Sequence, residues 1–336
     1  MNITIEDVAR TAGVSTATVS RALRGLPHVS AATRASITRI ALDLGYVPSK
    51  SASNLATGRT RTVGVVTPHI AKWFFAQAIE AVEQELRAEG YDVLLMVLPP
   101  GPGRQPGAFD PEGLRQRVDA VCVLTVPLTG TELDGLRGLS LPIVFVGGAV
   151  SGAMSVRIDD VEVGRTACEH LITLGHRRIA HIGGDPCEPL NFTAPVDRRA
   201  GWLSALRVAG IHPDPRTDVV GYFTVEGGRA AMQALLALPE PPTAVFAGSD
   251  EMAFGALDAL RDAGRSVPGD VSVIGVDDHD LAALFDLTTV AQPVEDQGRS
   301  AADLLLAALR GDPTHAQEHK LLPVALVVRG STGPPA

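Results

Sequence analysis

Hydroxyl side chains and one arginine gather near the N-terminus of the chain. Thr16, Thr18 and Ser20 carry the hydroxyl groups, and Arg21 follows them. Hydroxyl groups and the N–H groups at the start of a helix can bind phosphate oxygens, whereas an arginine can donate two hydrogen bonds to a guanine in the major groove. These residue types therefore indicate contact with a nucleic acid. The alternative is a solvated helix face that binds nothing.

Three short helices would position these side chains. Thr4 can cap a helix over residues 5–12, and Gly13 follows where the chain must turn with a positive φ. Ser15 can cap a second helix, and apolar residues at helical spacing predict a third over residues 30–44. Two helices that cross through a short turn, with hydroxyl groups on the outer face of the second, are typical of a helix-turn-helix.

Charge is distributed unevenly along the chain. Residues 1–62 contain eight Lys and Arg side chains against three Asp and Glu, whereas the whole chain of 336 residues has 29 against 38 and a net charge of −9. A basic N-terminal segment on an acidic body indicates that the N-terminal segment alone approaches a polyanion.

A polar segment after Pro48 contains one large apolar side chain, Leu55, among small residues. The segment is too short and too polar for a stable helix of its own. A linker is one interpretation. The other is a segment that folds when a partner receives Leu55, as leucine wedges do when they enter the DNA minor groove and bend the duplex.

The rest of the chain alternates short apolar runs with helical patterns. The runs of strand length span residues 62–66, 92–98, 120–124, 143–146, 178–182, 219–222, 244–247 and 271–276. The helical patterns between them span residues 75–89, 161–174, 199–209, 225–238 and 250–263. This alternation predicts parallel sheets with helices on both faces, and the number of runs is enough for two sheets.

Ligands of open parallel sheets bind beyond the carboxyl ends of the strands. Ser249, Asp277 and Gln292 come at or just after predicted strands, and Phe74 and Phe75 end the loop that follows the first strand. We therefore expect these side chains to surround a ligand site.

Several motifs in the N-terminal segment resemble one known family. They are Ile5-Glu6-Asp7-Val8-Ala9, Ala12-Gly13-Val14-Ser15, Thr18-Val19-Ser20-Arg21, Val29-Ser30 and Gly45-Tyr46-Val47-Pro48. Together they resemble the signature of the LacI/GalR family of bacterial transcriptional regulators, and a weaker resemblance continues over essentially the whole chain.

The resemblance implies roles in DNA binding for nine residues. By similarity, Thr16, Ala17 and Arg21 match the positions that read bases, and Leu55 matches the hinge leucine that enters the central step of the operator. Phosphate or base-edge contacts would come from Ser15, Thr18, Ser20, His28 and Thr33. Thr16 and Ala17 are too small to dictate a base sequence by themselves.

The resemblance also implies a small effector, a sugar or a nucleoside-like metabolite, between two lobes like those of periplasmic binding proteins. Arg198 and Asp277 match residues that hydrogen-bond the effector, and Phe74 or Phe75 would stack on it. The alternatives are a structural salt bridge for Arg198 and core packing for either Phe. Gly147 and Ser249 depart from several sugar-binding members, and residues 186–196 are a candidate source of replacement contacts.

We expect three domains and a homodimer bound to a pseudo-palindromic operator, with repression as the outcome. The expected domains are a helix-turn-helix over 1–47, a hinge over 48–61 and an effector-binding and dimerisation domain over 62–336. Its N-lobe would comprise about 62–158 and 291–321, and its C-lobe about 159–290 and 322–330. Three connections, near residues 156–160, 290–293 and 321–323, would make the lobes a hinged clamp.

Motifs of enzymes are absent from the sequence. No GxGxxG follows the first predicted strand, and neither a Walker lysine motif nor a GxSxG elbow occurs. His315 to His319 spell HxxEH, a string found in zinc peptidases, but without an evident third ligand. We therefore expect neither an enzyme nor a cofactor nor a metal ion.

One rival class shares the predicted body. A periplasmic sugar-binding protein would need a secretion signal in place of the basic segment over residues 1–58, and the N-terminus lacks the order of such a signal. No stretch has the roughly 18 apolar residues of a membrane span. The expectation is a cytoplasmic protein that does not contact membranes.

Overall fold

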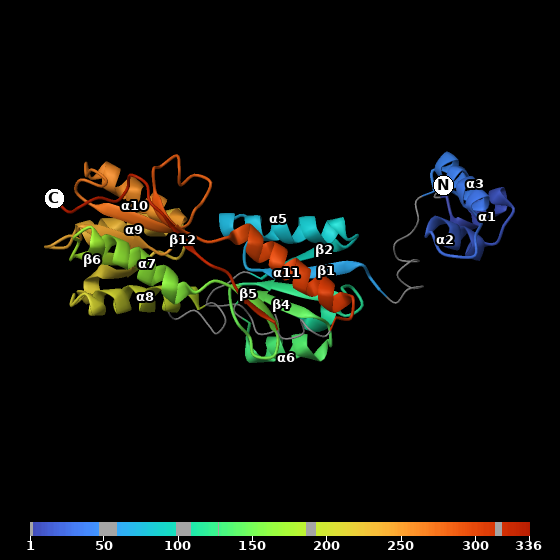
Figure 1. The fold of residues 1–336 in the computed structure, drawn as a ribbon, viewed down its shortest axis with the longest axis horizontal. Coiled ribbons are helices and arrows are strands. Elements are labelled where there is room, and N and C mark those ends of the chain that lie inside the picture. The colour runs from blue at the N-terminus through green and yellow to red at the C-terminus, as the bar shows by residue number, and fades with distance from the viewer. Residues whose placement is uncertain (1–2, 47–58, 99–108, 127, 186–192, 313–317) are drawn as a thin grey trace. The chain divides into compact units, whose positions relative to one another are not determined.

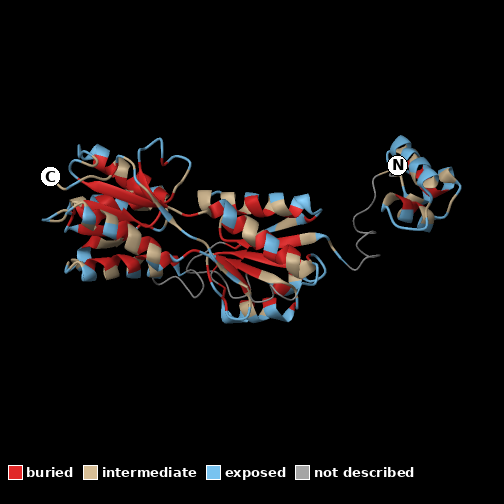
Figure 2. Cartoon of the chain, in the orientation of Figure 1, coloured by how far each residue is buried: buried red, intermediate tan, exposed pale blue. Residues whose placement is uncertain are grey.

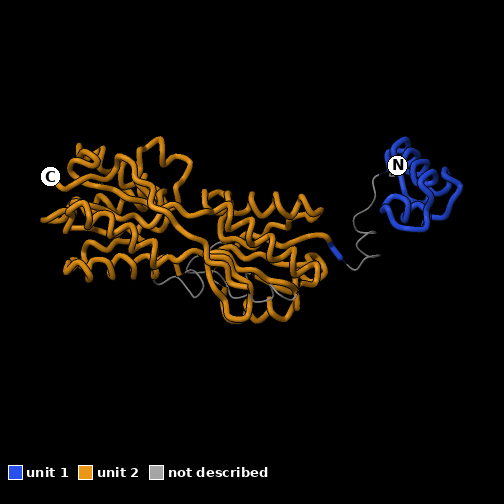
Figure 3. The backbone as a smooth tube through the Cα atoms, viewed as in Figure 1, with its two compact units in different colours: residues 1–60 blue, residues 61–336 orange. Residues whose placement is uncertain are grey.

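The computed structural model describes residues 3–46, 59–98, 109–126, 128–185, 193–312 and 318–336. The chain divides into two compact units, one that ends at Thr60 and one that begins at Arg61 (Figure 3). Leu55 and the rest of residues 47–58 lie outside the described residues.

The first unit consists of helices α1 (Ile5–Ala12), α2 (Thr16–Leu23) and α3 (Ala31–Leu44). All three predicted helices are confirmed. Gly13 adopts φ +67° at the end of α1, a conformation that favours glycine, and the turn leads directly into α2. Val8, Val19 and Ile37, one from each helix, meet in a small apolar core.

The second unit contains two parallel-sheet lobes, which confirms the predicted fold class. We call the first the N-lobe. Its six parallel strands follow the order β11-β5-β4-β3-β1-β2. They are β1 (Thr62–Thr67), β2 (Asp92–Val97), β3 (Ala120–Leu124), β4 (Ile143–Val146), β5 (Met154–Arg157) and β11 (His319–Leu321).

Helices cover both faces of the N-lobe sheet (Figure 1). Helices α5 (Trp73–Ala88) and α11 (Val294–Leu309) pack on one face, and α6 (Gly130–Gly138) with the 3-10 helix η1 (Pro111–Leu114) covers the other. Strand β3 is buried along its whole length, as a central strand between two helical layers should be. Figure 2 shows the strands of this sheet largely in red, the colour of buried residues.

The second lobe, called the C-lobe, repeats this plan. Its strands follow the order β12-β10-β9-β8-β6-β7, and β12 alone among them runs antiparallel to its neighbour. They are β6 (Ile179–Gly183), β7 (Asp218–Val220), β8 (Ala244–Ala247), β9 (Ser272–Asp277), β10 (Thr288–Ala291) and β12 (Ala325–Val327).

Four helices cover the C-lobe sheet. Helices α7 (Asp160–Thr173) and α8 (Ala194–Val208) pack on one face, and α9 (Val225–Leu236) with α10 (Asp250–Asp262) packs on the other. A 3-10 helix, η2 (Pro215–Thr217), precedes β7. Helix α8 begins five residues before the predicted 199–209, since Pro195 occupies its first turn, where the missing N–H of proline costs nothing.

The chain passes between the lobes three times. It crosses from β5 to α7, returns from β10 to α11, and crosses again from β11 to β12. Gln292 and Pro293 occupy the second crossing, whereas the first leaves two residues between β5 and α7. Side chains at these crossings therefore lie where the two lobes meet.

Candidate functional site

The outer face of α2 carries the residues predicted to contact DNA. Thr16, Ala17 and Arg21 are exposed, as is Ser15 just before the helix. The Ser15 hydroxyl accepts a hydrogen bond from the Thr18 backbone N–H at 3.2 Å and lies 2.9 Å from the Thr18 hydroxyl. Ser15 and Thr18 thus fix the start of α2, while the other three side chains remain accessible.

The remaining predicted DNA contacts lie on other parts of the first unit. Ser20 and Thr33 are half-buried, and His28 is exposed with φ +71° in the turn between α2 and α3. The Thr33 hydroxyl is 2.8 Å from the hydroxyl of Ser30, which caps α3. Leu55, the predicted hinge leucine, lies outside the described residues.

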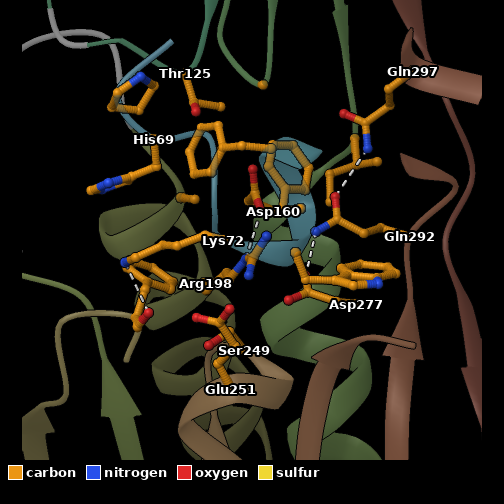
Figure 4. Close-up of a pocket in the computed structure, with 18 of the residues that line it drawn as sticks. His69, Lys72, Thr125, Asp160, Arg198, Ser249, Glu251, Asp277, Gln292 and Gln297 are labelled. Atoms are coloured by element: carbon orange, nitrogen blue, oxygen red, sulfur yellow. Dashed lines mark hydrogen bonds and ion pairs between the residues drawn. The ribbon is translucent and has the colours of Figure 1, made fainter. Parts of the chain in front are cut away.

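A cavity of about 160 Å³ lies between the N-lobe and the C-lobe (Figure 4). The N-lobe contributes Pro68, His69, Lys72, Trp73, Phe74, Phe75, Thr125, Gly147 and Gln297. The C-lobe contributes Asp160, Asp185, Ala194, Arg198, Tyr222, Phe223, Ser249, Glu251 and Asp277, and the crossings contribute Ile158 and Gln292. The aromatic wall comes mainly from the N-terminal turn of α5 and from residues that follow β7.

All six residues predicted to contact an effector line this cavity: Phe74, Phe75, Arg198, Ser249, Asp277 and Gln292. Phe74 and Phe75 meet edge to face, with ring centroids 5.2 Å apart. Phe75 is also buried in the N-lobe core, so the core packing that was the alternative for this residue is present, and its contact with an effector stays a prediction. Of residues 186–196, the candidate source of replacement contacts, residues 186–192 lie outside the described residues, and Ala194 lines the cavity.

Arg198 lies in the second turn of α8 and is fixed by two strong contacts. Its Nε donates to Asp160 Oδ1 at 2.7 Å, and its Nη1 donates to the backbone oxygen of Gly248 at 2.5 Å. The structural salt bridge that was the alternative interpretation is therefore present, and the same guanidinium lines the cavity. Burial raises the pKa of Asp160, and Arg198 opposes this shift.

Asp277 begins a row of hydrogen bonds that joins the two lobes. Gln292 Nε2 donates to Asp277 Oδ1 at 2.5 Å, and Gln297 Nε2 on α11 donates to Gln292 Oε1 at 3.0 Å. Burial raises the pKa of Asp277 to about 6, although the nearby Arg198 and the bond from Gln292 both lower it. The Gln297 amide of the N-lobe is thus linked to the Asp277 carboxyl group of the C-lobe through Gln292.

Ser249 has a structural task in addition to its place in the lining. Its Oγ accepts a hydrogen bond from the Met252 backbone N–H at 3.3 Å and caps α10. The hydroxyl proton stays available to a ligand, because a hydroxyl group both donates and accepts.

Two lining residues that the sequence analysis missed connect the lobes across the cavity. Lys72 Nζ donates to the backbone oxygen of Phe223 at 3.0 Å. The Trp73 and His279 rings lie 4.9 Å apart between centroids. Lys72 is the residue just before α5 and Trp73 is its first residue, so both lie before the predicted helix of residues 75–89.

None of the described residues forms a group of three or more His, Cys, Asp or Glu side chains that could hold a metal ion. His319, in the HxxEH string, is in β11 with Nδ1 2.8 Å from the Ser155 hydroxyl, and His315 lies outside the described residues. No helix within the described parts of the chain is long and apolar enough to cross a membrane.

A helix-turn-helix unit, and a two-lobed body that encloses a cavity lined by aromatic and polar side chains, together form the architecture of a DNA-binding regulator with a small-molecule sensor. Comparison with known families agrees. Residues 4–49 match the family model "Bacterial regulatory proteins, lacI family". Residues 168–332 match the model "Periplasmic binding protein-like domain".

Similar proteins extend the match to almost the whole chain. The HTH-type transcriptional repressor CytR of Escherichia coli (strain K12) is 37% identical, over 98% of this chain and 96% of CytR. The HTH-type transcriptional regulator CelR of Thermobifida fusca is 37% identical, over 93% of each chain. The chain belongs to the lacI family of bacterial regulatory proteins.

Solved structures include two informative relatives. The lac repressor dimer bound to operator and the anti-inducer ONPF has a TM-score of 0.87 and 28% identity, with 99% of this chain and 100% of that chain covered. A CelR–cellobiose complex has a TM-score of 0.71 and 36% identity, with 98% and 99% covered.

Proposed function

We propose that this protein is a transcriptional repressor that binds a pseudo-palindromic operator as a homodimer and responds to a small effector, a sugar or related metabolite. The observation that carries the proposal is that one chain combines the exposed α2 face with a cavity lined by polar side chains from two lobes. The first feature suits DNA, and the second suits a small molecule.

Base recognition is assigned to Thr16, Ala17 and Arg21 on α2. Ser15, Thr18, Ser20, His28 and Thr33 are assigned to phosphate or base-edge contacts. Arg21 is the residue with the reach to donate twice to a guanine, so most of the direct sequence preference of a half-site would come from it. Phosphate contacts would set the register of α2 on the duplex.

The domain boundaries belong to the same proposal. Residues 1–47 would bind the major groove, residues 48–61 would form the hinge with Leu55 in the minor groove, and residues 62–336 would bind the effector and dimerise. An effector controls DNA affinity when it binds two arrangements of the lobes with different affinities, and the three crossings are where such arrangements would differ.

Two names among the similar structures support a sugar-like effector and a DNA partner. The CelR structure is a cellobiose complex, and the lac repressor structure is a dimer on its operator. CytR and CelR are named as transcriptional regulators, which supports a protein without enzymatic activity. A transport-type sugar-binding protein is the second candidate, and the basic helix-turn-helix unit disfavours it.

DNA selection from a library of genomic fragments tests the proposal. Full-length protein should enrich fragments with a shared pseudo-palindrome and should bind them roughly 10³-fold or more tightly than unrelated DNA at the same salt concentration. A sugar at about 100 times its dissociation constant should stabilise the protein by about 2.7 kcal/mol and shift its melting temperature. Failure to enrich any fragment, with and without sugars, would overturn the proposal.

A further inference from the structure

Three residues of the cavity lining each contain one buried polar atom that has no hydrogen-bond partner among the described residues. The atoms are Trp73 Nε1, Thr125 Oγ1 and Gln297 Oε1, and they make up half of the six such side-chain atoms found in the described residues. A buried polar atom without a partner costs about 1 to 3 kcal/mol, so such atoms are few in folded proteins. Their concentration around one cavity indicates that a ligand supplies the missing partners.

The hydrogen bonds from Gln297 to Gln292 and from Gln292 to Asp277 determine which atom of Gln297 has no partner. An ionised Asp277 carboxylate can accept but not donate, so Gln292 must turn its Nε2 toward Asp277. Gln292 Oε1 then faces Gln297 and accepts a hydrogen bond from Gln297 Nε2. The carboxylate at one end therefore leaves an acceptor, Gln297 Oε1, at the other, and this orientation follows from the bonding rather than from the similar shapes of the two amide ends.

The position of Gln297 fits a ligand contact. Its side chain is 1% exposed and lines the cavity from α11. Figure 4 shows its amide nitrogen directed at Gln292 and its oxygen directed away from Gln292. Gln297 Oε1 is an acceptor, so the missing partner must be a donor, either a hydroxyl or an N–H group.

Charge narrows the class of ligand further. The described lining contains four carboxyl groups, on Asp160, Asp185, Glu251 and Asp277, against two cationic groups, on Lys72 and Arg198. Both cations already donate, Lys72 to Phe223 and Arg198 to Asp160 and Gly248. Burial and the neighbouring Lys72 lower the pKa of His69, so that this side chain adds no charge at neutral pH. An anionic ligand would therefore meet net repulsion between the two lobes, where charges are screened less than in bulk water.

We propose that the cavity selects an uncharged ligand that donates a hydrogen bond to Gln297 Oε1, and that it rejects phosphorylated or acidic forms of the same ligand. Gln297 is then a specificity-determining residue contributed by the N-lobe. The inference rests on the proposed function, because it defines the class of effector that the same cavity takes.

Paired probes test the charge requirement. D-Ribose, D-glucose and cellobiose are compared with ribose 5-phosphate, glucose 6-phosphate and gluconate by thermal shift and calorimetry on the full-length protein. At least one neutral sugar should bind, and its charged counterpart should bind at least about ten-fold more weakly. A charged probe that binds more tightly than its neutral parent overturns the inference.

The donor requirement is tested with deoxyfluoro analogues of whichever sugar binds, because fluorine cannot donate a hydrogen bond. In the wild-type protein, replacement of the hydroxyl group at one position by fluorine should weaken binding about ten-fold. This loss corresponds to a buried acceptor that loses its one hydrogen-bond donor. In Gln297→Leu the parent sugar should bind about ten-fold more weakly, and the fluorine at that position should cause no further loss. The analogue series on the wild-type protein decides the matter even if the variant does not fold.

Gln233→Leu is the matched control, since Gln233 is an exposed glutamine on α9 and is not part of the lining. It should bind every probe as the wild type does. Equal affinity of the wild type and Gln297→Leu for a bound sugar overturns this inference and leaves the proposed function standing. No shift with any probe counts against the effector-binding function itself, and the inference falls with it.

Discussion

Arg198 on α8 donates from Nε to Oδ1 of Asp160 on α7 over 2.7 Å, and both side chains are 8% exposed. The same guanidinium donates to the Gly248 backbone oxygen in the loop before α10. Arg198 therefore joins three segments of the C-lobe wall. These contacts hold the guanidinium in one orientation beside the cavity, so the ligand contact proposed for Arg198 would depend on the same contacts that join the three segments.

Arg198→Met is expected to lower the free energy of unfolding by about 3 to 5 kcal/mol, because the Asp160 carboxylate loses its partner inside the lobe. Urea unfolding of the protein without effector measures the change. Since removal of Arg198 raises the pKa of Asp160 further, the loss should shrink as the pH is lowered and that carboxyl group becomes protonated.

Arg165→Met is the control for this prediction. Arg165 on α7 also pairs with carboxylates, Glu162 and Glu169, but 42% of its side chain is exposed. A solvent-exposed pair of this kind contributes little to stability, because water and salt screen it. If Arg198→Met and Arg165→Met lower the free energy of unfolding by equally small amounts, the buried pair stabilises the protein no more than the exposed pairs do, and the prediction is wrong.

The pKa of Asp277 predicts a pH-dependent stability. Burial raises it from 3.8 to about 6, so the folded protein binds this proton more tightly than the unfolded chain does. The contribution of Asp277 to stability is therefore fully present below about pH 4 and is lost as the pH rises through 6. Asp277→Asn keeps the acceptor for Gln292 and removes the charge, so it should be more stable than the wild type at pH 7 and lose this advantage near pH 4.

The groups around Asp277 determine how this experiment is interpreted. Arg198 lowers its pKa, whereas Glu251 and Asp160 raise it, and Asp277 in turn raises the pKa of Asp250. Asp277→Asn should therefore also lower the pKa of Asp250, because it removes the neighbouring negative charge. Asp134→Asn, at a carboxylate that is 77% exposed, serves as the control, and melting temperatures between pH 4 and 7 should change in parallel for this variant and the wild type. A parallel course for Asp277→Asn as well would contradict the prediction.

Local signals explain why much of the structure could be predicted from the sequence. The first three helices begin at capping residues and two of them end at glycines with positive φ, Gly13 and Gly45, which are properties of a few neighbouring residues. Five of the six predicted cavity residues follow from a general rule, that parallel strands place the residues after them at one edge of the sheet. The sixth, Arg198, lies within α8 and was predicted only from the family resemblance. Thr125 directly follows β3 and was within reach of the same rule.

Contacts between distant segments explain what the sequence did not reveal. Gln297 lies within α11, and its direction depends on how α11 packs on α5. A Cβ on Gly298 would lie 2.7 Å from the backbone oxygen of Ala78, so these helices touch at that glycine and the neighbouring Gln297 faces the cavity. Strand β5 was also missed, because Ser155 and Arg157 alternate with its two apolar residues and leave no continuous apolar run.

Arg21→Ala should weaken operator binding by about 1 to 3 kcal/mol and relax the preference at one base pair in each half-site. The reason is that a guanidinium on the exposed face of α2 is suited to two hydrogen bonds with one guanine. Fluorescence anisotropy on the selected operator and on its single-base variants measures both effects. Arg10→Ala is the matched control, because Arg10 pairs with Asp7 on α1 and is 76% exposed. An unchanged base preference in Arg21→Ala would contradict the assignment of Arg21.

Leu55→Ala should abolish bending of the operator and reduce specific binding, while salt-dependent binding to unrelated DNA persists. The expected reason is that an apolar wedge unstacks a base step, whereas the charges that attract any duplex lie elsewhere in the first unit. Electrophoretic mobility of circularly permuted fragments reports the bend. Leu42→Ala is a matched control, since Leu42 is a leucine of α3 that is 74% exposed and has no assigned DNA contact. The hinge role of Leu55 is excluded if Leu55→Ala bends the operator as strongly as Leu42→Ala does.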